Sequence, residues 1–197
     1  MPWFAIPRAL FSRPAPSQPQ EMFPGRDGTN RLRPVWELFT FRKMDTTSLS
    51  PQVAEFAVDL RKSFPRSPRA RLGPYVVAAR ALDKCRATLL GWNGEYNFDC
   101  LLDNFFFGFA ELKAVAFKAE VAAGATDDDM IRWIGKNAAS HTPAEIVAWN
   151  NKMRETKVSD LPVEAQVFLE DYIPKFVPAG RVVYRWFDVY DLEEGRP

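Results

Sequence analysis

The sequence is poor in residues that build metal centres and lacks the common nucleotide-binding motifs. Its 197 residues include one histidine, His141, and two cysteines, Cys85 and Cys100. A standard zinc site takes three or four cysteine, histidine or acidic ligands, so we expect no metal site. There is no glycine-rich phosphate loop of the P-loop or dinucleotide type, and no G-x-S-x-G nucleophile elbow. We therefore also expect no cofactor.

Disulfide scaffolds and membrane spans are disfavoured as well. Two cysteines are too few for a disulfide framework. No apolar run reaches the roughly 18 residues that a membrane span needs, and no secretory signal pattern opens the chain. We expect a cytoplasmic protein with no membrane segment and two buried free thiols. A structural disulfide between Cys85 and Cys100 is the alternative.

The charge is nearly balanced but unevenly distributed. The chain carries a net charge of +1, and residues 1–43 hold seven basic residues against three acids, which leaves −3 for residues 44–197. A protein that coats nucleic acid usually shows a basic face over the whole domain. Nucleic acid is therefore a disfavoured partner.

The first 43 residues differ in composition from the rest. They contain seven of the 16 prolines and show no sustained hydrophobic period, and proline lacks the N–H group that helices and central strands use. Met44 begins a segment, MDTTSLSPQVAEF, that reads like a natural start. We expect residues 1–43 to be an upstream extension or a disordered arm, with an organelle-targeting peptide as the weaker alternative, and residues 44–197 to form one helical domain.

Helix signals dominate from Met44 onward and predict an all-α fold. Ser50-Pro51 is an N-cap signal, and apolar residues recur at helical spacing after it. Gly73-Pro74 should open a second helix over residues 75–90, which Gly91 should end. A long helix is expected over residues 101–123, with Gly108 as the point where it would break.

The second half shows equally specific signals. Thr126 should cap a helix whose first turn holds three aspartates, and Thr142 with Glu145 forms a capping box. A helix over residues 162–173 should end before Pro174. The C-terminal RVVYRWFDVYDLEE fits either a strand or a short helix, and a short helix is favoured because no partner strand is evident.

A basic loop is the first candidate site. The stretch RKSFPRSPRAR, residues 61–71, carries five basic residues and no acid. Guanidinium groups bind phosphate and carboxylate through paired hydrogen bonds, and the two prolines stiffen the loop. We expect Arg66, Arg69 and Arg71 to converge, with a helix N-terminus, on one small anion. The alternative is a solvated loop, or one paired internally with acids such as Asp59, Asp99 or Asp103.

Three further residues are expected to line the same pocket. Arg86 lies beside the apolar stripe of its helix, and either faces a polar pocket or pairs with Asp83 three residues earlier. Tyr96 and Asp103 belong to a polar segment next to a phenylalanine-rich run, and either could handle a proton in an enzyme. The alternatives are that Asp99 caps the helix near residue 101 and that the phenylalanines simply fill the core.

The sequence resembles a known family in three places. DLRKSFPRSPRARLGPYVVAARALDKCRATLLGWNGEYNFDCLLDNFFF, HTPAEIVAWNNKM and WFDVYDLEEGR are similar to the bacterial domain-of-unknown-function family 5069. The resemblance covers roughly residues 49–196. It implies no established activity.

Two function classes follow from these observations. The leading hypothesis is a helical domain, with or without catalysis, that binds a small phosphorylated or carboxylated ligand. The alternative is a protein–protein interaction or homo-oligomeric domain, whose sign would be an exposed aromatic patch that includes Trp186, Phe187 and Tyr190. The oligomeric state is left open.

Overall fold

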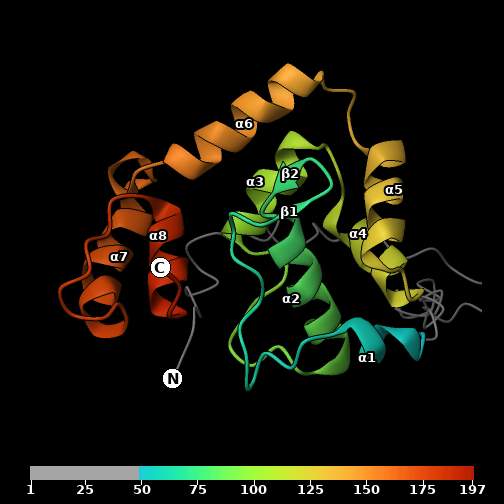
Figure 1. Cartoon of the computed structure of the whole chain (residues 1–197), viewed down its shortest axis with the longest axis horizontal. Helices are drawn as coiled ribbons and strands as arrows, with labels where there is room; N and C mark the ends of the chain where they lie inside the picture. Colours follow the sequence, from blue (N-terminus) through green and yellow to red (C-terminus); the bar gives the residue numbers. More distant parts are fainter. Residues whose placement is uncertain (1–48) are drawn as a thin grey trace, which may run out of the picture. The chain divides into compact units, whose positions relative to one another are not determined.

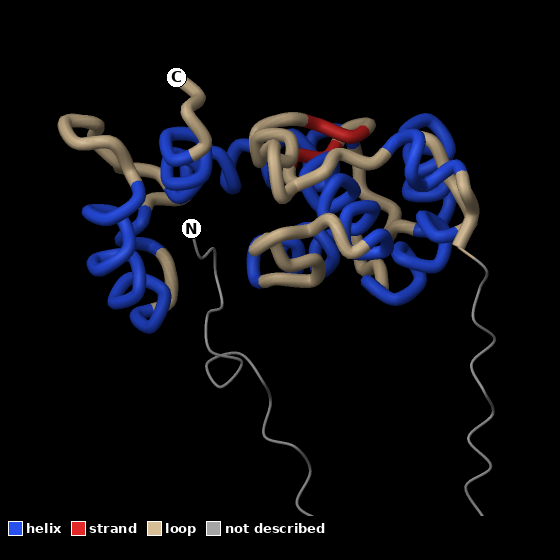
Figure 2. The backbone as a smooth tube through the Cα atoms, turned by 90° about the horizontal axis from the view of Figure 1, so that it is seen from below, coloured by secondary structure: helices blue, strands red, loops and turns tan. Residues whose placement is uncertain are grey.

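The computed structural model describes residues 49–197, and these form a helical domain. The expectations for residues 1–43 lie outside the described residues. Within the described part there are eight α-helices, one 3₁₀ turn and one two-stranded hairpin, so the all-α prediction is confirmed (Figures 1 and 2). The elements run in the order α1 (Gln52–Phe56), β1 (Arg71–Leu72), β2 (Tyr75–Val76), α2 (Ala78–Leu90), α3 (Leu101–Phe109), α4 (Ala114–Ala122), α5 (Asp127–Asn137), α6 (Pro143–Glu155), η3 (Val158–Asp160), α7 (Val163–Phe176) and α8 (Trp186–Glu193).

Helix α2 is the centre of the domain. It packs against α1, α3, α4 and strand β1, and Figure 1 shows it between the α4–α5 pair and the α7–α8 pair. Every residue from Ala78 to Ala87 is buried, although this stretch includes four charged side chains. Alanines make up much of the rest of the helix, and their small side chains let neighbouring elements approach closely. The charged residues of α2 are therefore enclosed rather than solvated.

A tight hairpin leads into α2. Strands β1 and β2 pair Arg71 with Val76 and Leu72 with Tyr75 around a turn in which Gly73 has a φ of +57°. Val77 follows with a φ of +67°, a conformation that β-branched residues rarely adopt. Its N–H donates to the carbonyl of Pro68 at 2.9 Å, and its side chain is fully buried. The surrounding packing holds this strained residue in place.

The core is aromatic. Phe106, Phe107 and Phe117 are buried and meet one another at ring-centroid distances of 5.3–6.4 Å. Phe109 stacks on Trp149 at 4.7 Å, whereas Phe105 is 38% exposed. The expectation of a phenylalanine core is therefore confirmed for two of the four phenylalanines between residues 105 and 109 and holds partly for Phe109.

Several helix boundaries differ from the sequence expectation. Residues 75–76 form a strand, so the second helix begins at Ala78. The long helix is interrupted at residues 110–113, just after Gly108, by a turn in which Glu111 has a φ of +52°. Pro174 lies inside the last turn of α7 instead of ending it. As expected, Thr126 caps α5, Thr142 and Glu145 form a capping box, and the C-terminal segment forms the short helix α8.

The cysteines and the membrane expectation can also be assessed. Cys85 and Cys100 are both free, so the disulfide alternative is wrong, but only Cys85 is buried and Cys100 is partly exposed. None of the helices in residues 49–197 is both long enough and apolar enough to cross a membrane.

The replacement Phe117→Ala should lower the free energy of unfolding by about 3–5 kcal/mol, because it leaves a cavity in the aromatic core. Urea unfolding followed by circular dichroism measures this loss. Val115→Ala on the same helix is the control, since Val115 is 69% exposed and its removal should change stability by no more than about 0.5 kcal/mol. Similar losses for both variants would contradict this description of the core.

Candidate functional site

Arg66 ties the basic loop to α2 and α5. Its backbone N–H donates to a carboxylate oxygen of Asp83 at 2.8 Å, and its guanidinium donates to Asp83 at 2.7 Å and to Asp127 at 2.6 Å. One nitrogen also donates to the carbonyl of Ala79. The residue therefore fixes the loop against the side of α2.

Arg86 also binds Asp127, through the other carboxylate oxygen. Its guanidinium donates to Asp127 at 2.7 Å and to the carbonyl of Ala125 at 2.9 Å. Pairing with Asp83 along the helix, the simple alternative for Arg86, is wrong. Burial works to raise the pKa of Asp127, but the hydrogen bonds from Arg66 and Arg86 outweigh it and lower that pKa. The sequence predicts only that Asp127 interacts favourably with the dipole of its helix. In the structure its carboxylate also bridges Arg66 and Arg86.

Arg69 and Arg71 do not join Arg66 and Arg86 at Asp127. The guanidinium of Arg69 donates to Asp188 at 2.6 Å and to Asp191, both on α8, and lies 5.7 Å from the ring centre of Phe187. Arg71 lies exposed on β1, and its side chain makes no hydrogen bond or ion pair with residues 49–197. The structure does not bring the three arginines to one point. The loop is paired internally instead. Asp59, one of the expected acids, pairs with Arg61 at 2.8 Å, whereas the acids that pair with Arg66 and Arg69 were not among those expected.

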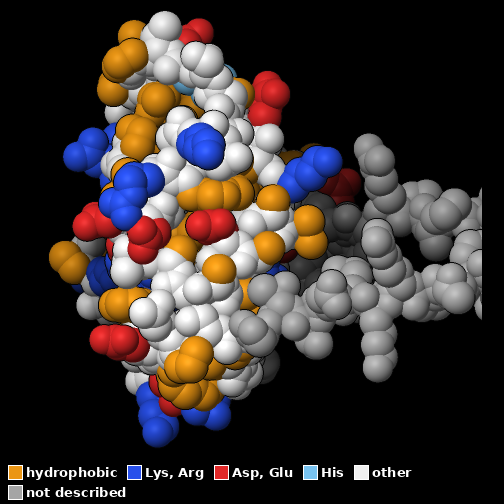
Figure 3. Space-filling view, turned by 90° about the vertical axis from the view of Figure 1, so that its right-hand side faces the viewer, with side chains coloured by type: hydrophobic (Ala, Val, Ile, Leu, Met, Phe, Trp, Pro, Cys, Tyr) orange, Lys and Arg blue, Asp and Glu red, His pale blue; other side chains and the backbone are white. Residues whose placement is uncertain are grey.

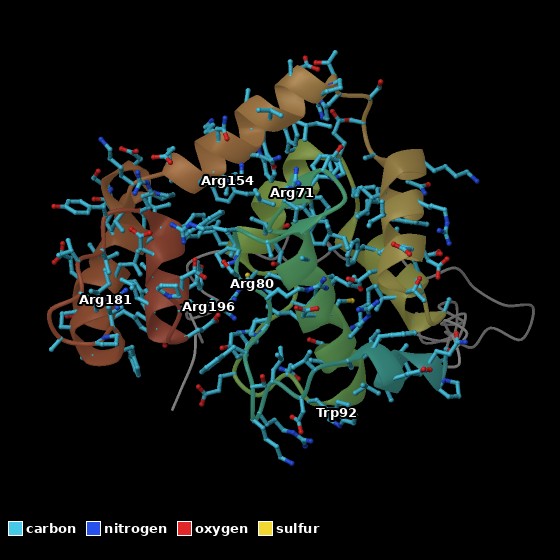
Figure 4. The ribbon with its side chains drawn as sticks, in the orientation of Figure 1. Arg71, Arg80, Trp92, Arg154, Arg181 and Arg196 are labelled. Carbon is cyan, nitrogen blue, oxygen red and sulfur yellow. The ribbon has the colours of Figure 1, made fainter. Side chains whose placement is uncertain are left out.

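A buried ion pair joins α2 to the end of α8. The guanidinium of Arg80 donates to both carboxylate oxygens of Glu194, at 2.6 and 3.0 Å, and the two side chains are almost fully buried. Tyr96 donates its hydroxyl to Glu194 at 3.1 Å, and Arg196 also contacts Glu194. The Arg80 guanidinium lies 4.9 Å from the ring centre of Tyr190. Figure 4 shows Arg80 on α2 directed toward Arg196 beside α8.

A second buried pair, Lys84 with Asp103, joins α2 to α3. The ammonium of Lys84 lies 2.8 Å from Asp103 and donates to the Cys100 sulfur at 3.1 Å and to the carbonyl of Asn97 at 3.0 Å. Asp103 accepts the backbone N–H of Asp99, which has a φ of +62°. Cys100 occupies the N-cap position of α3, so the expectation that Asp99 caps this helix is wrong.

The sequence candidates therefore separate into groups. Arg66 and Arg86 meet at Asp127, while Tyr96 and Asp103 lie at the two buried junctions on α2. The residues that sequence reasoning missed are Arg80, Lys84, Asp127, Asp188, Asp191 and Glu194. A usable signal existed in residues 80–86, which hold four charges within an alanine-rich helix, but only the three-dimensional packing shows that they are enclosed.

Near the C-terminal end of α8, burial also raises the pKa of three tyrosines and of the Glu193 carboxyl. It is the main cause of the raised pKa of Tyr96, Tyr172 and Tyr190. Glu193 accepts the Tyr172 hydroxyl at 2.6 Å. Burial nevertheless raises the pKa of Glu193 to about 8, with a further contribution from Glu194.

A hollow of about 440 Å³ lies elsewhere, on the side formed by α1, α4 and α5. Its lining mixes acidic and basic side chains with Trp133 and includes none of the six candidate residues. Figure 3 shows that charges of both signs are interspersed with apolar groups on this side of the molecule. No group of three or more histidine, cysteine or acidic residues within residues 49–197 has the arrangement of a metal site.

These features define a helical domain whose elements are joined by buried ion pairs. Residues 62–196 match the family described as domain of unknown function (DUF5069). This match spans more than half of the chain, so the protein belongs to that family. A search of the curated proteins finds no match.

Glu193 should make stability depend on pH. Its proton is bound more tightly in the folded state, so its stabilising contribution is complete below the ordinary pKa of 4.5 and is lost as the pH rises through about 8. The replacement Glu193→Gln removes this titration. Chemical denaturation of both proteins should show the variant gaining more than about 1 kcal/mol relative to wild type between pH 5 and pH 9. A constant difference across this range would contradict the assignment.

Proposed function

We propose that the domain binds a small anionic ligand, phosphorylated or carboxylated, on the solvent-facing side of the loop formed by residues 66–71. Arg71 is its main contact, and the exposed edges of Arg69 and Arg66, which do not converge with Arg71 on one point, extend the cationic surface of the loop. Arg86, Tyr96 and Asp103 act from behind this surface. Arg86 binds Asp127, Tyr96 binds Glu194 and Asp103 binds Lys84. These three partners in turn position the loop and its supporting helices.

The observation that carries the proposal is the exposed guanidinium of Arg71, which has no ion-pair partner in residues 49–197, on a loop whose Arg66 and Arg69 are partly exposed. The side chains of Arg66 and Arg69 are each 35% exposed, and of their four acidic partners Asp83 and Asp191 are only 5% and 6% exposed, Asp188 is 20% exposed and Asp127 is 40% exposed. Asp83 and Asp191 thus lie behind the guanidinium groups, Asp127 offsets the charge of Arg66 at the surface, and the most cationic part of the loop is at Arg69 and Arg71. Charges placed in this way attract an anion from solution even though the ion pairs balance overall.

Unused hydrogen-bond donors support the same conclusion. A guanidinium has five N–H groups, and Arg69 spends two nitrogens on Asp188 and Asp191. The remaining donors of Arg69, and all those of Arg71, have no acceptor in residues 49–197. Phosphate and carboxylate oxygens are the acceptors that guanidinium groups match best.

The loop is also pre-organised. Pro65 and Pro68 restrict its backbone, the N–H of Ala70 donates to the carbonyl of Ser67 at 2.9 Å, and the carbonyl of Pro68 accepts from Val77. Arg66 and Arg69 anchor the loop to α2 and α8 on its two sides. Little conformational entropy remains to be lost when a ligand binds.

The alternative of an aromatic interaction patch is not favoured. Trp186 and Phe187 are 4% and 0% exposed, and Tyr190 is 8% exposed. The patch expected from the sequence is therefore part of the interior, where these residues pack α8 against the rest of the domain.

Thermal unfolding of the full chain against a panel of phosphorylated and carboxylated small molecules tests the proposal. A ligand present at 100 times its Kd should add about 2.7 kcal/mol of stability. Arg71→Ala should abolish this shift without lowering the basal unfolding temperature, because the Arg71 side chain has no internal partner. Arg66 and Arg69 are poor test positions, since their removal would also break the anchors of the loop.

Arg181→Ala is the matched control. Arg181 is likewise exposed, and Figure 4 shows it in the loop after α7, apart from Arg71. This variant should keep the full ligand-induced shift. The proposal is wrong if no compound shifts the wild type, or if Arg71→Ala retains the shift.

A further inference from the structure

Arg154, on α6, resembles Arg71 in having no carboxylate partner within residues 49–197. The residue is partly exposed. In the described part of the chain its guanidinium makes one hydrogen bond, to the side-chain oxygen of Asn151 on the same helix at 3.3 Å. A guanidinium has five N–H groups, so most of the donors of Arg154 are available to a ligand.

The position of Arg154 relative to the hairpin follows from the contacts of Asn150. The side chain of Asn150 accepts the N–H of Val76 at 3.1 Å and donates to the carbonyl of Pro74 at 2.7 Å. Val76 is the strand partner of Arg71. Residues four apart lie on the same face of a helix. Arg154 therefore lies one turn away from the point where α6 contacts the hairpin that carries Arg71.

The end of α6 is attached to the start of α8. The N–H of Trp186 donates to the carbonyl of Thr156 at 2.9 Å, and Arg69 attaches the basic loop to the same helix. Arg154 thus lies between the hairpin and the start of α8, the two elements that hold the end of the basic loop. Figure 4 shows both arginines that lack a carboxylate partner in this region, beneath α6.

The carboxylates of the surrounding elements already have cationic partners. Glu155 pairs with Arg185 at 2.8 Å, and the aspartates of α8 pair with Arg69. The charges of Arg71 and Arg154 therefore remain uncompensated by the described residues. Two such cations on neighbouring elements attract an anion more strongly than one does.

We propose that Arg154 is a second contact residue of the anion site, and that the site takes ligands with two anionic groups, one bound at Arg71 and the other at Arg154. The inference rests on the proposed anion binding and extends it to a class of ligand. Phosphate and carboxylate groups share the recognition chemistry, because both accept paired hydrogen bonds from a guanidinium. A ligand with a single anionic group gains only one of the two contacts.

Isothermal titration calorimetry of the full chain with four probes tests the inference. Pyrophosphate and succinate carry two anionic groups, and inorganic phosphate and acetate are their counterparts with one. Within the preferred pair, the probe with two groups should bind at least about 10-fold more tightly, the effect of one further charge-assisted contact. The pair that shows this preference distinguishes phosphate from carboxylate recognition.

Arg154→Ala should weaken binding of the preferred two-group probe by about 10-fold and that of its one-group counterpart by no more than about 2-fold, because only the two-group probe reaches the second guanidinium. Lys152→Ala is the matched control. It removes the same charge from an exposed position two residues earlier on α6, and should keep the wild-type affinity for both probes.

The outcomes separate this inference from the proposed function. If Arg71→Ala weakens binding but Arg154→Ala does not, the inference is overturned and the proposed function stands. The inference is also overturned if Lys152→Ala weakens binding as much as Arg154→Ala, since the effect is then one of net charge. Failure of all four probes to bind overturns the inference as well, whereas the proposed function is decided by the wider panel of compounds.

Discussion

The buried ion pair between Arg80 and Glu194 is the interaction on which the arrangement of the domain depends. Transfer of two charges from water to the interior is costly, and the cost is offset only where geometry and additional hydrogen bonds are good. The Glu194 carboxylate accepts hydrogen bonds from the two terminal nitrogens of Arg80 and from the Tyr96 hydroxyl, and it also contacts Arg196. Arg80 in turn donates to the carbonyl of Arg66 at 3.1 Å. One pair thus links α2, the C-terminal end and the basic loop.

In the proposed anion binding, the basic loop would have a structural role and a binding role at once. Arg66 donates hydrogen bonds to Asp83 and Asp127, and Arg69 donates to the two aspartates of α8. Their outward edges, with Arg71, remain directed at solvent. The carboxylates that hold the loop together also orient its guanidinium groups, so under the proposal fold stability and ligand affinity would depend on the same residues.

Local signals in the sequence predicted much of the fold. The capping residues Thr126 and Thr142 placed helix starts correctly, because an N-cap hydrogen bond depends only on residues within one turn. The hairpin at residues 71–76 was missed, since Gly73-Pro74 reads as a helix start and a two-residue strand has no visible period. Pro174 predicts a helix end, but it lies inside the last turn of α7.

The candidate site was less predictable for a physical reason. Arg66 and Asp127, or Arg80 and Glu194, are 61 and 114 residues apart in the chain, and nothing in their local sequence marks them as partners. The charge density in residues 61–71 marks the loop as a candidate site. It could not show that Arg66 and Arg69 are anchored from below while Arg71 is not.

A double-mutant cycle on Arg80 and Glu194 tests this account most directly. Unfolding free energies of the wild type, Arg80→Met, Glu194→Gln and the double variant give the coupling between the two side chains. If the pair joins α2 to the C-terminal end as described, each single change leaves a buried charge without its partner, and the coupling energy should be about 2 kcal/mol or more. Additivity of the two single changes to within about 0.5 kcal/mol would contradict it.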